Sequence, residues 1–190
     1  MRPEPGQVLH FSEDPSITRF VPHRAATARQ PGEYVWAVDA ARSPDYWFPR
    51  QCPRVLAWTT PGSTAGDRDR IIGPGCGVRV HAVEFGWLER MRAVELYAYR
   101  LDAAAFRPFG DSAVVAEEPV VPLGPAERVG DLFELHEEAG ISLRALPSLW
   151  PFWDHVTSSS LGWSGIRLRN ALPRPAESLV NVEVWDFSAE

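Results

Sequence analysis

The sequence contains no lysine, and all 19 of its basic residues are arginine. This absence excludes enzymes that form a Schiff base through a lysine, including those that anchor pyridoxal phosphate in this way, because both need an ε-amino group. It also excludes the Walker-type phosphate loop, whose lysine reaches the phosphates, and the Ser–Lys dyad of some hydrolases. Any phosphate group bound by a side-chain cation must therefore meet arginine.

Cysteine is also scarce, and the two examples are Cys52 and Cys76. They lack CxxC spacing, so they cannot form a thiolate zinc site alone, and one pair is no secreted disulfide framework. A single disulfide is open to them, but we expect two free thiols in a reducing cytoplasm. We predict no metal site, because the five histidines lie far apart in the sequence.

Long apolar runs are absent too, and none approaches the roughly 18 residues that span a bilayer. The first six residues hold an acid and two prolines and lack the apolar core of a signal peptide. These features predict a cytoplasmic protein without a membrane partner. The net charge of −6, from 19 basic and 25 acidic residues, argues against binding to duplex nucleic acid.

The length of 190 residues, with 45% hydrophobic and 23% charged, predicts one globular domain over residues 1–190. Apolar and alternating runs predict strands at 7–11, 33–38, 55–59, 78–83, 94–101, 113–116, 142–146 and 179–187. Cap and proline signals predict helical segments at 14–20, 43–47 and 125–136 and a short helix from Ala103. Apolar spacing predicts a helix at 84–92, and 148–170 is a further helical region, broken near 162–165. The mixture, without regular βαβ units, predicts an α+β fold with antiparallel or mixed sheets and short helices.

Two glycine-rich stretches resemble functional loops without matching them. The run Gly73–Gly77 has its third glycine one residue early for a dinucleotide fingerprint and leads into a predicted strand rather than a helix. The run Gly162–Gly165 is one residue short of a nucleophile elbow. Residues 60–77, with five glycines and two prolines, predict a long mobile loop suited to a lid or binding role.

Three segments put titratable side chains where apolar strand residues are expected. One of them is 36–50, with Asp39, Tyr46 and Arg50 around an aromatic cluster. His10 interrupts the short apolar strand at 7–11, and Glu117 and Glu118 lie between the apolar runs 113–116 and 120–121. Because adjacent strand residues point to opposite faces, one glutamate faces inward unless the strand has already ended. A buried carboxylate is costly unless it is hydrogen-bonded or functional.

Four stretches resemble an uncharacterised bacterial family, a domain of unknown function: residues 9–15, 46–54, 118–120 and 147–151. More remotely, the order of signals is similar to the ADP-ribosyltransferase-like superfamily, which carries a His or Arg on one core strand, an aromatic or hydroxyl residue on a second and a Glu on a later one. This resemblance implies a split sheet, with His10, Tyr46 (or Trp36) and Glu118 as the three catalytic positions. Phe11-Ser12 after the histidine departs from the common Gly-Thr pattern.

The same resemblance implies NAD as substrate of a transferase or glycohydrolase, either active or an inactive relative. A glutamate on the ribose hydroxyls would stabilise the oxocarbenium character that develops when the nicotinamide–ribose bond breaks. His10 would hydrogen-bond the second ribose, and an aromatic face would stack on nicotinamide. Arg19 and Arg50 would bind the pyrophosphate bidentately, and Ser12 and Trp36 complete the predicted ligand-binding set.

Other interpretations stay open at this point. His10 can be a structural histidine bonded to a carbonyl, Glu118 a solvated strand end, and Tyr46 an ordinary core residue. The chain can also be a non-enzymatic domain that binds a small ligand or protein through its aromatic cluster, in which Trp150 and Trp153 matter more than His10. A third interpretation is a hydrolase that uses His10 with Asp14 or Glu13. The sequence does not predict the oligomeric state.

Overall fold

The computed structural model describes residues 1–24, 32–110 and 113–174. The strands in these residues are β1 (Gln7–Ser12), β2 (Val35–Ala37), β3 (Arg54–Trp58), β4 (Arg79–Glu84), β5 (Tyr97–Asp102), β6 (Arg107–Phe109), β7 (Ala113–Ala116), β8 (Glu127–Arg128), β9 (Ser142–Leu146) and β10 (Gly162–Ile166). The α-helices are α1 (Ala65–Asp67), α2 (Leu88–Ala93), α3 (Leu132–Glu138) and α4 (Trp150–Thr157). Tighter or wider helical turns are η1 (Ser43–Tyr46), η2 (Arg68–Ile72), η3 (Phe85–Trp87), η4 (Ala103–Ala105) and η5 (Leu168–Asn170).

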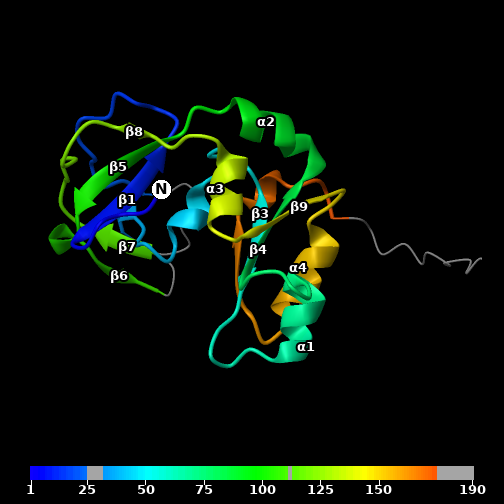
Figure 1. Ribbon diagram of the computed structural model, residues 1–190. Helices are drawn as coiled ribbons and strands as arrows, with labels where there is room; N and C mark the ends of the chain where they lie inside the picture. The colour runs from blue at the N-terminus through cyan, green and yellow to red at the C-terminus, as the bar shows by residue number, and fades with distance from the viewer. Residues whose placement is uncertain (25–31, 111–112, 175–190) are drawn as a thin grey trace, which may run out of the picture.

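The strands form three small sheets, in the orders β1-β5-β8, β10-β3-β4-β9 and β2-β7-β6. Each pairing is antiparallel except that of β4 with β9, which is parallel. Figure 1 shows β1, β5, β6, β7 and β8 on one side of the molecule and β3, β4 and β9 with α1 and α4 on the other, with α3 between them. The expected α+β class with antiparallel and mixed sheets and short helices is confirmed.

The two faces of β1 belong to different parts of the core, because successive strand side chains point to opposite sides. Val8 packs in a cluster with Phe20, Tyr99 and Leu101. Leu9 packs on the other face, in a cluster that includes Trp47, Ala98 and Leu132. The strand therefore separates two apolar layers, and a side chain on one face cannot meet a side chain on the other.

The predicted helix at 14–20 is wrong. Asp14 Oδ1 accepts the backbone N–H of Ser16 at 2.8 Å, which forms a local turn, and the chain then runs extended to Phe20. The Tyr99 hydroxyl donates to the Asp14 carbonyl at 2.6 Å and accepts the Ile17 N–H at 3.0 Å. A side chain 85 positions away thus satisfies backbone groups that a helix would have used.

The predicted mobile loop at 60–77 is also wrong, because it contains α1 and η2. Thr64 caps the first turn by accepting the Asp67 N–H at 3.2 Å. Ile71 and Ile72 are fully buried against β3 and β4. The segment therefore contributes to the core, although its high glycine content had predicted a loop.

The helix predicted from Pro125 begins later, at Leu132, and is capped by Asp131, whose Oδ1 accepts the Phe133 N–H at 2.7 Å. Residues Glu127–Arg128 pair with β5 instead. In the region 148–170, Gly162–Ile166 is strand β10, paired with β3, rather than an interruption of a helix. The predicted strand at 179–187 lies outside the described residues.

The other predicted strands are present within one to three residues of their expected ends. In the described parts of the chain, no helix has the length and apolar character needed to cross a bilayer.

Candidate functional site

His10 lies on β1 with its ring packed against that of Phe20 at a tilt of 46°, with 4.6 Å between the ring centroids. Its Nδ1 lies 2.7 Å from the carbonyl oxygen of Trp36 on β2. A carbonyl oxygen only accepts, so Nδ1 carries the proton and Nε2 presents a lone pair. Burial lowers the pKa of His10, and the positive charge of Arg50 lowers it further, while the hydrogen bond to Trp36 opposes both effects. The ring is therefore neutral at neutral pH.

Phe20 connects His10 to two other predicted site residues. Its backbone pairs with Val120, with the Phe20 N–H donating to the Val120 carbonyl at 2.8 Å. Glu118 stands two residues before Val120 and is exposed, just after the end of β7. Arg19 stands directly before Phe20 and is also exposed. Arg19 and Glu118 thus lie close in sequence to the Phe20–Val120 bridge, and the Phe20 ring contacts the His10 ring.

Tyr46 does not join that neighbourhood. It lies in η1 and packs with the Leu9 cluster, on the face of β1 opposite to His10. The Arg54 guanidinium lies 5.5 Å from the centre of its ring. Burial raises the pKa of the Tyr46 hydroxyl, so it stays protonated over the physiological range.

Ser12 and Trp36 have local structural partners. The Ser12 hydroxyl accepts the Asp14 N–H at 3.1 Å, and the residue is 2% exposed. The Trp36 ring packs edge-on against Phe109 at 5.0 Å and near Tyr34 at 5.9 Å. Trp36 interacts with His10 through its backbone carbonyl oxygen, which accepts the hydrogen bond from His10 Nδ1.

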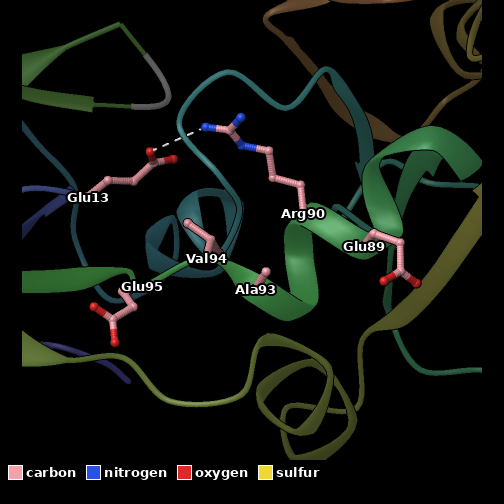
Figure 2. Close-up of a pocket in the computed structure, with 6 residues that line it drawn as sticks. All are labelled: Glu13, Glu89, Arg90, Ala93, Val94 and Glu95. Atoms are coloured by element: carbon pink, nitrogen blue, oxygen red, sulfur yellow. Dashed lines mark ion pairs between the residues drawn. The ribbon is translucent and has the colours of Figure 1, made fainter.

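Arg50 is exposed and lies beside the end of β1. Its backbone N–H donates to Glu13 Oε1 at 2.8 Å, and its carbonyl accepts from Arg167 Nε at 3.3 Å. A shallow hollow of about 570 Å³ opens beside Glu13 (Figure 2). Its wall is made by residues of α2 and the two segments that flank it: Glu13, Glu89, Arg90, Ala93, Val94 and Glu95.

This hollow does not suit an anionic ligand. Three carboxylates line it, and Arg90 faces Glu13 at 3.7 Å, as the dashed line in Figure 2 marks. A phosphate placed there would be repelled by three carboxylates and attracted by one guanidinium.

A buried polar centre that the sequence analysis missed lies around Asp45 in η1. The Asp45 side chain is fully buried, with Arg79 Nη1 3.1 Å from Oδ1 and Arg42 Nη2 3.0 Å from Oδ2. Arg54 Nε donates to the Asp45 carbonyl at 2.7 Å. Three arginines from separate segments therefore meet one aspartate in the interior.

Two histidines extend this centre from Asp45 to α3. His81 Nε2 lies 3.6 Å from Asp45 Oδ1, and His81 Nδ1 lies 3.0 Å from His136 Nε2. His136 Nδ1 lies 2.6 Å from the carbonyl oxygen of Leu132. One sequence signal could have found it: His81 interrupts the buried run of β4, as His10 interrupts β1.

A second hollow, of about 440 Å³, has His136 at its edge. Its other lining residues come from α2, α3, β9 and the residue before β9: Leu88, Phe133, Glu137, Ile141, Leu143 and Ala145. Both ring nitrogens of His136 already have partners, so the histidine offers this hollow only its carbon atoms. Across the described residues, no group of three or more His, Cys, Asp or Glu side chains could hold a metal ion.

The tryptophans of the alternative interpretation make contacts within the chain. The Trp150 indole donates to the Leu172 carbonyl at 2.7 Å. Trp153 packs edge-on against Trp163 at 5.2 Å, and Trp163 on the edge strand β10 is 44% exposed.

Comparison with known proteins gives one match. A family model described as a family of unknown function, DUF6886, matches residues 9–171. Neither the curated proteins nor the solved structures that were compared give a match. The resemblance to the ADP-ribosyltransferase-like superfamily gains no support from these comparisons. Because the matched model covers most of the chain, this protein belongs to DUF6886, a family of unknown function.

Proposed function

We propose that this protein binds a nucleotide-like ligand, with NAD as the first candidate, on the His10 side of strand β1. The observation that carries the proposal is the hydrogen bond from His10 Nδ1 to the Trp36 carbonyl. It directs a neutral imidazole with a free lone pair on Nε2 away from the backbone. A sugar hydroxyl is the kind of donor that such a nitrogen accepts.

The ligand's phosphates would meet arginine, the only strong side-chain cation in this sequence. Arg19 and Arg50 are both exposed, and within the described residues neither guanidinium makes an ion pair. Planar guanidinium groups bind phosphate oxygens bidentately.

Glu118 supplies the carboxylate of the proposed site. In an NAD glycohydrolase, the C1′–N bond breaks and its electron pair leaves with neutral nicotinamide. Water then adds to C1′ and loses a proton. A carboxylate that accepts hydrogen bonds from the ribose hydroxyls stabilises the positive charge that develops on the ribose during this step. The exposed position of Glu118, without an ion pair among the described residues, leaves it free for that role.

The proposal leaves out Tyr46, because it packs on the other face of β1. The test is isothermal titration of the full chain with NAD. His10→Ala, Arg19→Ala and Arg50→Ala should each weaken binding about tenfold or more. The matched control is His155→Ala, because His155 is an exposed histidine of α4. Absence of heat with the unchanged protein at millimolar NAD would overturn the proposal.

A further inference from the structure

The hydrogen bonds of the buried histidines leave the chain Asp45–His81–His136–Leu132 one proton short. Three close contacts run along it: Asp45 Oδ1 to His81 Nε2, His81 Nδ1 to His136 Nε2, and His136 Nδ1 to the Leu132 carbonyl. Each contact needs one hydrogen, and the two end atoms are oxygens that accept when Asp45 is ionised. Two neutral imidazoles carry only two N–H protons, so one of the three contacts has no hydrogen.

The geometry identifies the incomplete contact. The 2.6 Å contact at Leu132 requires a proton on His136 Nδ1, so His136 Nε2 accepts from His81 Nδ1–H at 3.0 Å. His81 Nε2 is then bare. It is buried, has no hydrogen-bond partner among the described residues, and lies 3.6 Å from Asp45 Oδ1, beyond hydrogen-bond distance.

The opposite placement of the two imidazole protons fails at the Leu132 carbonyl. If His81 Nε2 carried the proton and donated to Asp45, His81 Nδ1 would accept from His136 Nε2–H. A neutral His136 would then turn a bare Nδ1 towards the Leu132 carbonyl at 2.6 Å, which brings two lone pairs together. The short contact therefore assigns the missing proton to the Asp45 end.

We propose that the gap between His81 Nε2 and Asp45 Oδ1 is a proton-binding site, filled when the protein is acidified. The bound proton completes a continuous chain of hydrogen bonds from η1 through β4 to α3. This gives the fold a pH-sensitive connection between three elements. It is independent of the ligand site proposed around His10, since it lies among different residues.

The charges around His81 decide when the proton binds. Asp45 favours it, while Arg42, Arg79 and Arg54 oppose it. Burial is the largest effect and lowers the pKa of His81, while Asp45 raises it in part. The pKa of His136 is lowered to about 3 by burial and by His81, so His136 stays neutral. Asp45 lies beside His81 Nε2 and not beside His136, so the single added proton resides on His81, and burial places its binding below the ordinary histidine value of about 6.5.

The test is a pH titration of the unchanged protein labelled with ¹⁵N in histidine, observed through the imidazole nitrogens. At pH 7.5, both His81 and His136 should carry a proton on Nδ1 and none on Nε2. On acidification, His81 Nε2 should gain a proton while the fold is intact, and His136 should not. A proton on His81 Nε2 at pH 7.5, or a His81 that stays neutral until unfolding, would overturn the proposal.

A variant isolates the part played by the carboxylate. In Asp45→Asn the neutral amide cannot stabilise an imidazolium, so the His81 midpoint should fall by at least one pH unit. Glu89→Gln, on the exposed surface of α2, is the matched control and should leave the midpoint unchanged. An unchanged midpoint in Asp45→Asn would contradict the assignment. The titration of the unchanged protein does not depend on whether this variant folds.

Discussion

The guanidinium of Arg54, at the start of β3, donates to the Asp45 carbonyl at 2.7 Å and to the Cys52 carbonyl at 2.9 Å. It also lies 4.9 Å from the ring centre of Phe48. One buried cation thus ties both ends of the segment 45–52 to the sheet. This segment carries Arg50, so its conformation places a residue of the proposed ligand site.

Replacement of Arg54 by lysine should lower the free energy of unfolding by about 3 kcal/mol. An ammonium cannot reproduce the bidentate donation, and a buried carbonyl left without a donor is costly. Urea denaturation would measure the loss. Arg169→Lys, an exposed control, should change stability by less than about 0.5 kcal/mol. Equal stability of the two variants would show that Arg54 does not organise the segment.

Glu84 holds the C-terminal end of the described chain. Its carboxylate accepts the N–H of Leu149 at 3.3 Å and that of Leu172 at 3.0 Å. Glu84→Gln should cost about 1–3 kcal/mol, since one acceptor oxygen becomes a donor that faces other donors. The comparison is with Glu89→Gln in urea denaturation, where we expect almost no change. A neutral outcome at both positions would contradict this role for Glu84.

The two thiols should differ in reactivity. Cys52 is fully buried, and burial raises the pKa of its thiol to about 12, whereas Cys76 is half-buried. Since the thiolate is the reactive form, a thiol reagent at pH 8 should modify Cys76 in the folded protein and Cys52 only after unfolding. Cys76→Ser should remove the fast phase. Two fast thiols in the native protein would be inconsistent with the buried position of Cys52.

Stability should fall as the pH drops below about 6.5. The pKa values of His81 and His136 are lowered in the folded state, so the unfolded chain binds more protons in this range. The stability that these neutral histidines contribute is fully present above the pKa of a histidine in the unfolded chain. It is lost as the pH falls below that pKa. Each histidine should contribute a slope of about 1.4 kcal/mol per pH unit, until the folded protein binds its own proton.

Urea midpoints at pH 7, 6 and 5 would measure this slope. His155→Gln, at an exposed position, should leave it unchanged, while His136→Gln should reduce it. Constant stability over this range would contradict the buried neutral state of both histidines.

The sequence predicted most strands, because short apolar runs are buried in them, as β3 and β4 show. It failed where distant side chains determine the backbone. At Asp14 a proper helix cap is present, but the Tyr99 hydroxyl and the pairing of Phe20 with Val120 hold the chain extended. At Ile71 and Ile72 the helical turns are too short to show a helical spacing of apolar residues. The glycines of the segment therefore led to the prediction of a loop.

The candidate site was predicted unevenly for the same reason. His10 and Glu118 were selected because they interrupt apolar runs, and their role stays a prediction. Tyr46 was matched by its order in the sequence, which does not reveal the face of β1 that it packs against. The Asp45 centre gathers residues from η1, β3, β4 and α3. Its one local signal is His81 in the buried run of β4, and that signal does not reveal which other segments meet there.

The claim on which the proposed function depends is that His10 Nε2 is a free acceptor for a ligand hydroxyl. The direct measurement is the imidazole ¹⁵N spectrum of His10 at pH 7, recorded without NAD and during a titration with it. We predict a neutral ring with its proton on Nδ1, and an Nε2 resonance that shifts and saturates as NAD binds. A proton on Nε2 in the free protein, or an Nε2 resonance that stays unchanged at millimolar NAD, would contradict the account.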